Sequence, residues 1–195
     1  MYIYKTDVQH LSFSLAIGLH YAKGEFIARM DSDDISTPDR LELQVEYMIN
    51  NPDIIVLGTC YELIDYKGHP IKKISLPLYN NDIRRTFIIG NPICHPSVMF
   101  RRKEIIDIGG YLGDIYAQDY DLWARLAMNK KYKFANLKKI CLQYRVQGSG
   151  NARKSRLAYA SMAGAQFRNF IYGAGISWFV GALISAFKAV IVSKK

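Results

Sequence analysis

Helix and strand signals alternate along residues 11–130, and this alternation limits the possible folds more than any other feature of the sequence. Residues 11–24 read as a helix closed by Gly24, and further helices are predicted near 38–49, 81–89, 102–110 and 120–128. Short apolar runs predict strands at 25–30, 54–64 and 97–100, with a turn at 66–70. Such spacing is typical of βα units. The sequence therefore predicts an α/β fold.

Three carboxylates follow the strand predicted at residues 25–30. Asp31, Asp33 and Asp34 occupy three of four consecutive positions, and Thr37 and Pro38 then provide an N-cap and a first helical residue. Ligands of open α/β sheets gather at the carboxyl ends of strands, and Mg²⁺ uses one or two protein carboxylates together with phosphate oxygens. The pattern favours a metal and diphosphate site. The alternatives are a solvated turn that caps the helix, or an EF-hand, which the missing loop glycine disfavours.

The helix predicted after this turn has an apolar face made by Leu41, Val45 and Met48. A second acidic pair, Asp119 and Asp121, lies at the start of the helix predicted at 120–128. Carboxylates at this position also favour the positive end of the helix dipole, so capping alone explains both. The functional alternative is that Asp119 faces the cleft of Asp33 and accepts a proton from an attacking hydroxyl, while Asp121 supports the helix start.

The C-terminal residues 151–195 form a basic and apolar tail after a nearly neutral body at residues 1–150. The tail contains no Asp or Glu and supplies most of the net charge of +9. Its basic residues are Arg153, Lys154, Arg156, Arg168, Lys188, Lys194 and Lys195. Because the charge is confined to an apolar tail, a nucleic-acid binder is disfavoured. Three widely spaced cysteines give neither a disulfide framework nor a zinc site, and the N-terminus has no secretory signal pattern, so we expect a reducing cytosol.

Residues 170–192 carry only Lys188 as a charge and would extend about 34 Å as one helix. This length is sufficient to cross a bilayer. Small residues recur every fourth position from Gly173 to Ala189 and would pack along one stripe. We expect membrane association, with an interfacial helix or a helix docked on the body as alternatives to a span. The basic residues before the segment would keep the body on the cytoplasmic side of a bacterial membrane.

Several motifs, taken together, resemble glycosyltransferase family 2, which has the GT-A fold, and particularly its bacterial members of surface-polysaccharide assembly. The motifs cover roughly residues 11–150 and occur in the family's order. They are "GEFIARMDSDDISTPDRLELQVEYM", "NPDIIVLGT", "NPICHPSVMFRR", "GGY", "AQDYDLWARLA" and "YRVQGSG". The resemblance implies a Rossmann-like GT-A core with a mixed sheet over residues 1–150. It also implies an inverting enzyme that transfers a sugar from a nucleotide-diphosphate donor to a hydroxyl of a glycan or lipid-linked acceptor.

The resemblance also implies roles for particular residues. Asp31 and Asp33 match the family's D-x-D, which holds a divalent metal, Mg²⁺ or Mn²⁺, and Asp119 matches the usual catalytic base. Asp31 and Asp34, together with His95 and Arg145, are expected to bind substrate. For His95 and Arg145, a buried histidine and a surface arginine are the structural alternatives.

The sequence departs from the family pattern in two ways. Gln118, Ala16 and Gln147 stand where the family usually has Glu, Asn and His. In addition, the family begins with a strand, a helix and a strand that bind the nucleotide base, and the resemblance implies that this sequence starts after them. Roughly 60 residues would be lacking, at ~30 per βα unit, which would leave a bare sheet edge or face. The alternative function is therefore a non-catalytic fragment or a membrane-tethered interaction module.

Overall fold

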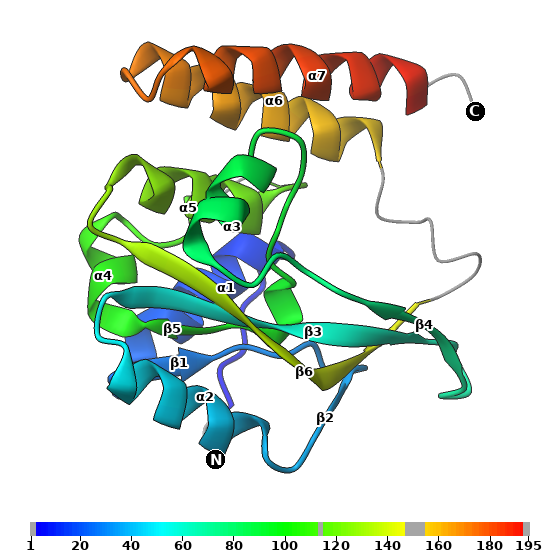
Figure 1. Ribbon diagram of the computed structural model, residues 1–195. Helices are drawn as coiled ribbons and strands as arrows, with labels where there is room; N and C mark the ends of the chain where they lie inside the picture. Colours follow the sequence, from blue (N-terminus) through cyan, green and yellow to red (C-terminus); the bar gives the residue numbers. More distant parts are fainter. Residues whose placement is uncertain (1–2, 113–114, 147–154, 193–195) are drawn as a thin grey trace.

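The computed structural model describes residues 3–112, 115–146 and 155–192, and within them a single six-stranded sheet lies between helices (Figure 1). The strands are β1 (Phe26–Ala28), β2 (Ile35–Ser36), β3 (Ile54–Ile64), β4 (Pro70–Ile74), β5 (Met99–Arg101) and β6 (Lys133–Arg145). The helices are α1 (Leu11–Tyr21), α2 (Arg40–Asn50), α3 (Asn80–Thr86), α4 (Arg102–Asp107), α5 (Gln118–Met128), α6 (Arg156–Ile171) and α7 (Ile176–Val192), with a 3₁₀ turn η1 (His95–Ser97).

The sheet is mixed, as the resemblance implies. Its strand order is β1-β5-β3-β6-β2, with β4 paired to β3 beyond this path. Only the pairing of β3 with β6 is parallel among the described strands. The sequence predicts β3 at its observed bounds, and it also predicts β1, β5 and the turn between β3 and β4. Helices α3, α4 and α5 likewise lie where the sequence places them.

Strand β6 is absent from the sequence prediction although it is the longest strand of the sheet. Its sequence, KFANLKKICLQYR, has three lysines that interrupt the alternation of apolar and polar residues. Register shifts along its pairing with β3 explain part of this irregular pattern, because each shift exchanges the faces of the residues that follow. Phe134 and Leu142 are nevertheless fully buried. Tertiary packing therefore establishes β6 where local periodicity does not.

Helix α2 begins at Arg40 with Asp39 in the N-cap position, two residues after the predicted cap at Thr37. The two-residue strand β2 precedes it, and the Thr37 amide donates to a backbone carbonyl of β6 at 3.0 Å, which keeps Thr37 in extended pairing. Of the predicted apolar face, Met48 is fully buried and Val45 packs partly buried against the core, as predicted. Leu41 is 54% exposed instead, and Arg40 and Gln44 are buried. The side chains of Arg40 and Gln44 donate hydrogen bonds to four backbone carbonyls, which offset the cost of burying them. These polar contacts therefore hold α2 against β3 and against the segments next to β1 and β5.

The apolar tail forms two helices instead of one continuous helix. Gly173 and Gly175 have φ values of 85° and 103°, and they reverse the chain between α6 and α7. The two helices pack side by side above α3 and α5 (Figure 1). In the described part of the chain, none of the helices has the length and apolarity that a bilayer crossing needs. Helix α7 packs along α6, and its Lys188 Nζ donates to the Ile89 carbonyl at 2.6 Å.

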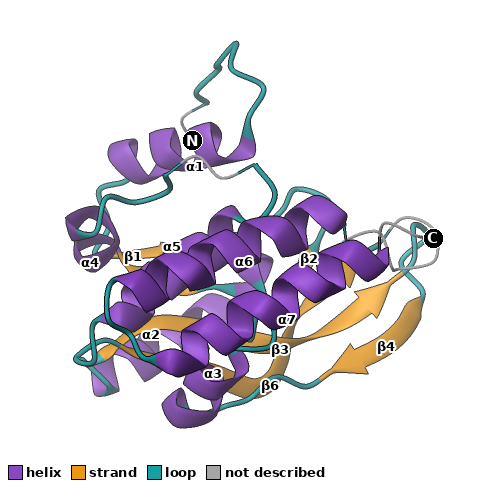
Figure 2. Cartoon of the chain, turned by 90° about the horizontal axis from the view of Figure 1, so that it is seen from above, coloured by secondary structure: helices purple, strands orange, loops and turns teal. Residues whose placement is uncertain are grey.

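At one edge of the sheet, β1 pairs only with β5 among the described strands. Helix α1 lies at the margin of the molecule beside this edge (Figure 2). It ends at Tyr21, before the predicted stop at Gly24, and it leaves Leu11, Phe13 and Tyr21 between 44% and 51% exposed. Among the described strands, β1 is thus one edge of the sheet and β2 is the other, and the absence of further strands beside β1 stays a prediction.

Candidate functional site

A cleft of about 810 Å³ opens where β1, β3, β6, α5 and α6 converge. Five residues that the sequence analysis singled out line this one cleft, although they lie up to 114 positions apart. They are Asp31, Asp33, His95, Asp119 and Arg145. The structure therefore places the predicted metal carboxylates and the predicted base around a common volume.

Asp31 and Asp33 lie on the turn that follows β1, and Arg145 at the end of β6 contacts this turn directly. The Arg145 Nε atom donates to the Asp33 carbonyl at 2.8 Å. Its Nη1 atom donates to the carbonyls of Asp65 and Tyr66, at 2.9 and 3.0 Å, in the turn between β3 and β4. Arg145 therefore connects the acidic turn to the β3–β4 hairpin while it also lines the cleft.

Asp34 is not among the residues that line the cleft, so its role in substrate binding stays a prediction. Its side chain is buried, and its Oδ1 atom accepts a hydrogen bond from the Arg145 backbone amide at 2.8 Å. Carboxylates that accept backbone N–H bonds form strong charge-assisted contacts. Asp34 therefore fixes the position of the acidic turn instead of facing the cleft.

Asp119 lies in the first turn of α5, and its Oδ2 atom accepts a hydrogen bond from Asn91 Nδ2 at 2.8 Å. Burial raises the pKa of the Asp119 carboxyl, while hydrogen bonds from the Tyr120 amide and from Asn91 and the charge of Arg29 act in the opposite direction. A carboxylate with a raised pKa accepts a proton more readily than an exposed one. This environment is compatible with the predicted role of Asp119 as a general base.

His95 is buried in η1 and also reaches the cleft. Its Nε2 atom lies 2.9 Å from the Tyr111 hydroxyl, and its ring packs edge-on against Trp123. Burial raises the pKa of Tyr111, so this hydroxyl stays protonated at neutral pH. The arrangement combines the two sequence alternatives, because His95 is both a buried, partnered histidine and a residue of the cleft wall.

Asp121 supports the helix that carries Asp119, as the sequence analysis expects. Its two carboxylate oxygens accept hydrogen bonds from Arg125 Nε at 2.9 Å and Arg168 Nη1 at 2.5 Å. Arg125 in turn donates to the carbonyls of Ile108 and Gly110. Because Arg168 belongs to α6, this network connects the C-terminal hairpin, which consists of α6 and α7, to the start of α5.

Two cleft residues, Arg29 and Asn91, are missing from the sequence predictions although both stand inside the quoted motifs. Arg29 immediately precedes the acidic turn, and its guanidinium makes a two-pronged contact with the Asp31 carboxylate. Asn91 begins the "NPICHPS" motif and contacts Asp119. Their position in motifs that also carry His95 and Asp31 is the signal that could have identified them.

The chemistry of the acidic turn fits a divalent metal with few protein ligands. The described residues contain no group of three or more His, Cys, Asp or Glu side chains that could enclose an ion. Asp31 and Asp33 nevertheless supply two carboxylates to one cleft. Mg²⁺ characteristically binds one or two protein carboxylates and takes its other ligands from phosphates and water. The donor set therefore suits a metal that arrives with a phosphorylated ligand.

The fold is that of the GT-A glycosyltransferases. The mannosyltransferase PcManGT from Pyrobaculum calidifontis, solved in complex with GDP-Man and Mn²⁺, matches with a TM-score of 0.58 and 12% sequence identity. The match covers 97% of this chain and 55% of the mannosyltransferase. At this identity the likeness concerns the fold.

Sequence comparison then gives the family. Residues 2–109 match the model of "Glycosyl transferase family 2". The chain is 37% identical over 191 residues to the O-antigen biosynthesis glycosyltransferase WbnJ of Escherichia coli. The match covers 97% of this chain and 74% of WbnJ. It is 35% identical over 147 residues to the amylovoran biosynthesis glycosyltransferase AmsE of Erwinia amylovora, and spans about half, 54%, of that relative. The chain belongs to glycosyltransferase family 2.

Proposed function

We propose that this chain is the catalytic part of an inverting glycosyltransferase of surface-polysaccharide synthesis, which transfers a sugar from a nucleotide-diphosphate donor to an acceptor hydroxyl. The observation that carries the proposal is the convergence of Asp31, Asp33 and Asp119 on one cleft. Two relatives that act in O-antigen and amylovoran biosynthesis support the substrate class. The GDP-Man and Mn²⁺ in a structure of the same fold support a nucleotide-sugar donor and a divalent metal.

In the proposed reaction, the acceptor hydroxyl oxygen attacks the anomeric carbon from the side opposite the diphosphate. The new C–O bond forms as the bond to the diphosphate oxygen breaks, the hydroxyl proton passes to Asp119, and the nucleoside diphosphate leaves. A metal held by Asp31 and Asp33, Mg²⁺ or Mn²⁺, would neutralise the charge of the leaving diphosphate. Asn91 holds the Asp119 carboxylate in place by its hydrogen bond at 2.8 Å. Arg145 fixes the turn that carries Asp33.

Separate substitutions of the two carboxylate sites test this assignment. Asp33→Asn is expected to abolish metal-dependent binding of the donor. Asp119→Asn is expected to leave donor binding intact and to lower turnover by roughly 10² or more, because it removes only the base. Donor binding is measured by calorimetry with Mn²⁺ across a panel of nucleotide sugars, and turnover by release of nucleoside diphosphate. Asp82→Asn on α3 is the matched control, because it removes a solvent-exposed carboxylate of the helix surface.

Equal loss of donor binding in both variants would contradict the separate roles. A wild-type chain that binds the donor but releases no nucleoside diphosphate with any glycan or lipid-linked acceptor would support the alternative, a non-catalytic interaction module.

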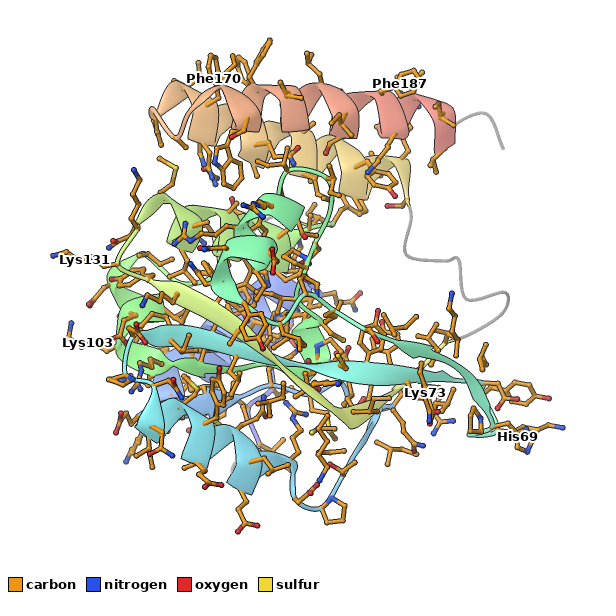
Figure 3. The ribbon with its side chains drawn as sticks, viewed as in Figure 1. His69, Lys73, Lys103, Lys131, Phe170 and Phe187 are labelled. Atoms are coloured by element: carbon orange, nitrogen blue, oxygen red, sulfur yellow. The ribbon has the colours of Figure 1, made fainter. Side chains whose placement is uncertain are left out.

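We further propose that the outer face of α7 attaches the enzyme to an anionic membrane on its cytoplasmic side, where a lipid-linked acceptor would meet the cleft. The face that α7 turns toward the body carries mostly small residues, whereas large apolar side chains lie outward. Trp178, Gly181, Ala182, Ser185 and Ala189 are buried, and Ile176, Val180, Leu183, Phe187 and Val190 are 46–67% exposed. Figure 3 shows Phe187 on the side of α7 remote from the sheet.

The charge of the tail supports a lipid surface as the partner of this face. Residues 151–195 have seven Lys and Arg and no acidic residue, and two of them, Arg168 and Lys188, contact Asp121 and the Ile89 carbonyl of the body. Basic residues near an anionic membrane contribute ~1 kcal/mol each, and an apolar helix face adds the free energy of its buried area. A protein partner would not require this excess of one charge sign. Co-sedimentation with liposomes tests the attachment.

A further inference from the structure

Arg29 lines the cleft that also contains Asp31 and Asp119. It follows β1 directly, and its side chain is only 9% exposed. Its Nη1 atom donates to Asp31 Oδ2 at 3.1 Å, and its Nη2 atom donates to Asp31 Oδ1. The charge of Arg29 also favours the ionised form of Asp119. A single guanidinium therefore serves both the carboxylate assigned to the metal and the carboxylate assigned to the base.

The main chain at Arg29 is fixed from both sides. Its amide donates to the carbonyl of Val98 at 3.0 Å, and its carbonyl accepts a hydrogen bond from Arg40 Nη2 at 2.7 Å. Arg40 is itself buried and bonded to Gln44. Because the backbone is held while the Arg29 side chain ends in a partly open cleft, a change of partner requires only side-chain rotation.

The contact between Arg29 and Asp31 conflicts with the binding of a metal ion at Asp31. Both carboxylate oxygens of Asp31 already accept hydrogen bonds from Arg29. A divalent cation at Asp31 would repel the guanidinium, and arginine cannot relieve the repulsion by losing its proton. The guanidinium must then find another anion within the cleft. Its two-pronged geometry matches a phosphate as well as a carboxylate.

We propose that Arg29 exchanges partners during donor binding: it occupies Asp31 in the metal-free enzyme and turns to the donor diphosphate when the metal takes its place. This proposal rests on the proposed function, because it requires Asp31 to hold the metal. Its consequence is that the metal alone binds poorly, since it must displace Arg29 without offering another anion. The metal and the diphosphate therefore bind cooperatively, and Arg29 is the residue that couples them.

The test measures the two ligands separately, with inorganic diphosphate in EDTA and with Mn²⁺ in the absence of any phosphate. Arg29→Gln is expected to bind Mn²⁺ about tenfold more tightly than the wild type, and metal-free diphosphate about tenfold more weakly. A residue that only supports the fold would instead weaken both ligands. Arg29→Lys keeps the charge but loses the two-pronged contact, so its Mn²⁺ affinity should lie between those of the wild type and Arg29→Gln.

Arg85→Gln is the matched control, because it removes the same charge from a side chain that is 82% exposed on α3. It should leave both affinities unchanged. Mn²⁺ affinities of Arg29→Gln and Arg29→Lys at or below the wild-type value would overturn the exchange. Asp33→Asn distinguishes the two failures: if Asp33→Asn weakens Mn²⁺ binding but the Arg29 variants do not strengthen it, the exchange is wrong and the proposed metal site stands. If Asp33→Asn has no effect on Mn²⁺ binding, the proposed metal site itself is wrong.

Discussion

Replacement of Phe187 by glutamate tests the proposed membrane face most directly, because the structure gives the area at stake. Phe187 is 66% exposed and Leu183, one turn earlier on the same face, is 56% exposed. Complete burial of such a side chain contributes up to ~3 kcal/mol, so insertion of the exposed part of Phe187 contributes about 2 kcal/mol. Loss of this contribution corresponds to a roughly 30-fold weaker partition into the membrane. Phe187→Glu together with Leu183→Glu removes about 3 kcal/mol or more, a loss of over 100-fold.

The assay is co-sedimentation of the intact chain with vesicles that contain phosphatidylglycerol, over a range of lipid concentrations. Tyr66→Glu is the matched control, because Tyr66 is 70% exposed in the turn between β3 and β4. His69, three positions further along the chain, lies well away from Phe187 in Figure 3. Circular dichroism checks that each variant is folded. Salt near 1 M, where the screening length is about 3 Å, should weaken binding of the wild type by removing the electrostatic part.

Two results would refute the reasoning. If Phe187→Glu and the wild type partition equally into the vesicles, the apolar face of α7 takes no part in membrane binding. A loss as large in Tyr66→Glu as in Phe187→Glu would mean that added negative charge, irrespective of its position, explains the effect.

Two further predictions concern the cleft and the C-terminal hairpin. Asn91→Ala removes a hydrogen bond to the ionised Asp119, so the pKa of this carboxyl should rise further above its usual range. Activity is lost as pH falls through that pKa, so the acidic limb of the pH–rate profile should move to higher pH. Gly181→Val should lower the free energy of unfolding, measured in urea, by about 2 kcal/mol, because a Cβ at Gly181 would lie 2.8 Å from the Ile88 carbonyl oxygen. Gly164→Ala is the control: a Cβ at Gly164 meets open space, so this variant should not be destabilised.

The sequence by itself determined the class of fold and the family. Strand β3 and the turn after it follow from an apolar run that ends before a glycine, and both form where local pattern predicts them. Asp31 and Asp33 follow a short strand, and the carboxyl ends of strands are where ligands of open α/β sheets gather. The combination of motifs then indicated the family. These features depend on residues close together in the chain, so local pattern is sufficient to predict them.

The tertiary structure decided which polar residues face the cleft and which are buried beneath it. Asp33 and Asp34 are adjacent, yet Asp33 lines the cleft and Asp34 is buried against the backbone of Arg145, 111 positions away. Likewise, Arg29 and Asn91 acquire their roles from partners in the folded chain. No local pattern specifies such pairs, because each requires the register of strands that are distant in sequence.

Local pattern also fails to specify the structure of the C-terminal tail, here for whole helices instead of single residue pairs. Its apolar composition permits a membrane span, an interfacial helix or a docked helix, because hydrophobicity alone does not say what covers a helix face. The two glycines at 173 and 175 turn the chain, and the stripe of small residues then lets α7 approach α6 and the carbonyl of Ile88 closely. The physical reason is steric: only the folded body determines that the small side chains lie inward, which leaves the large apolar side chains of α7 exposed.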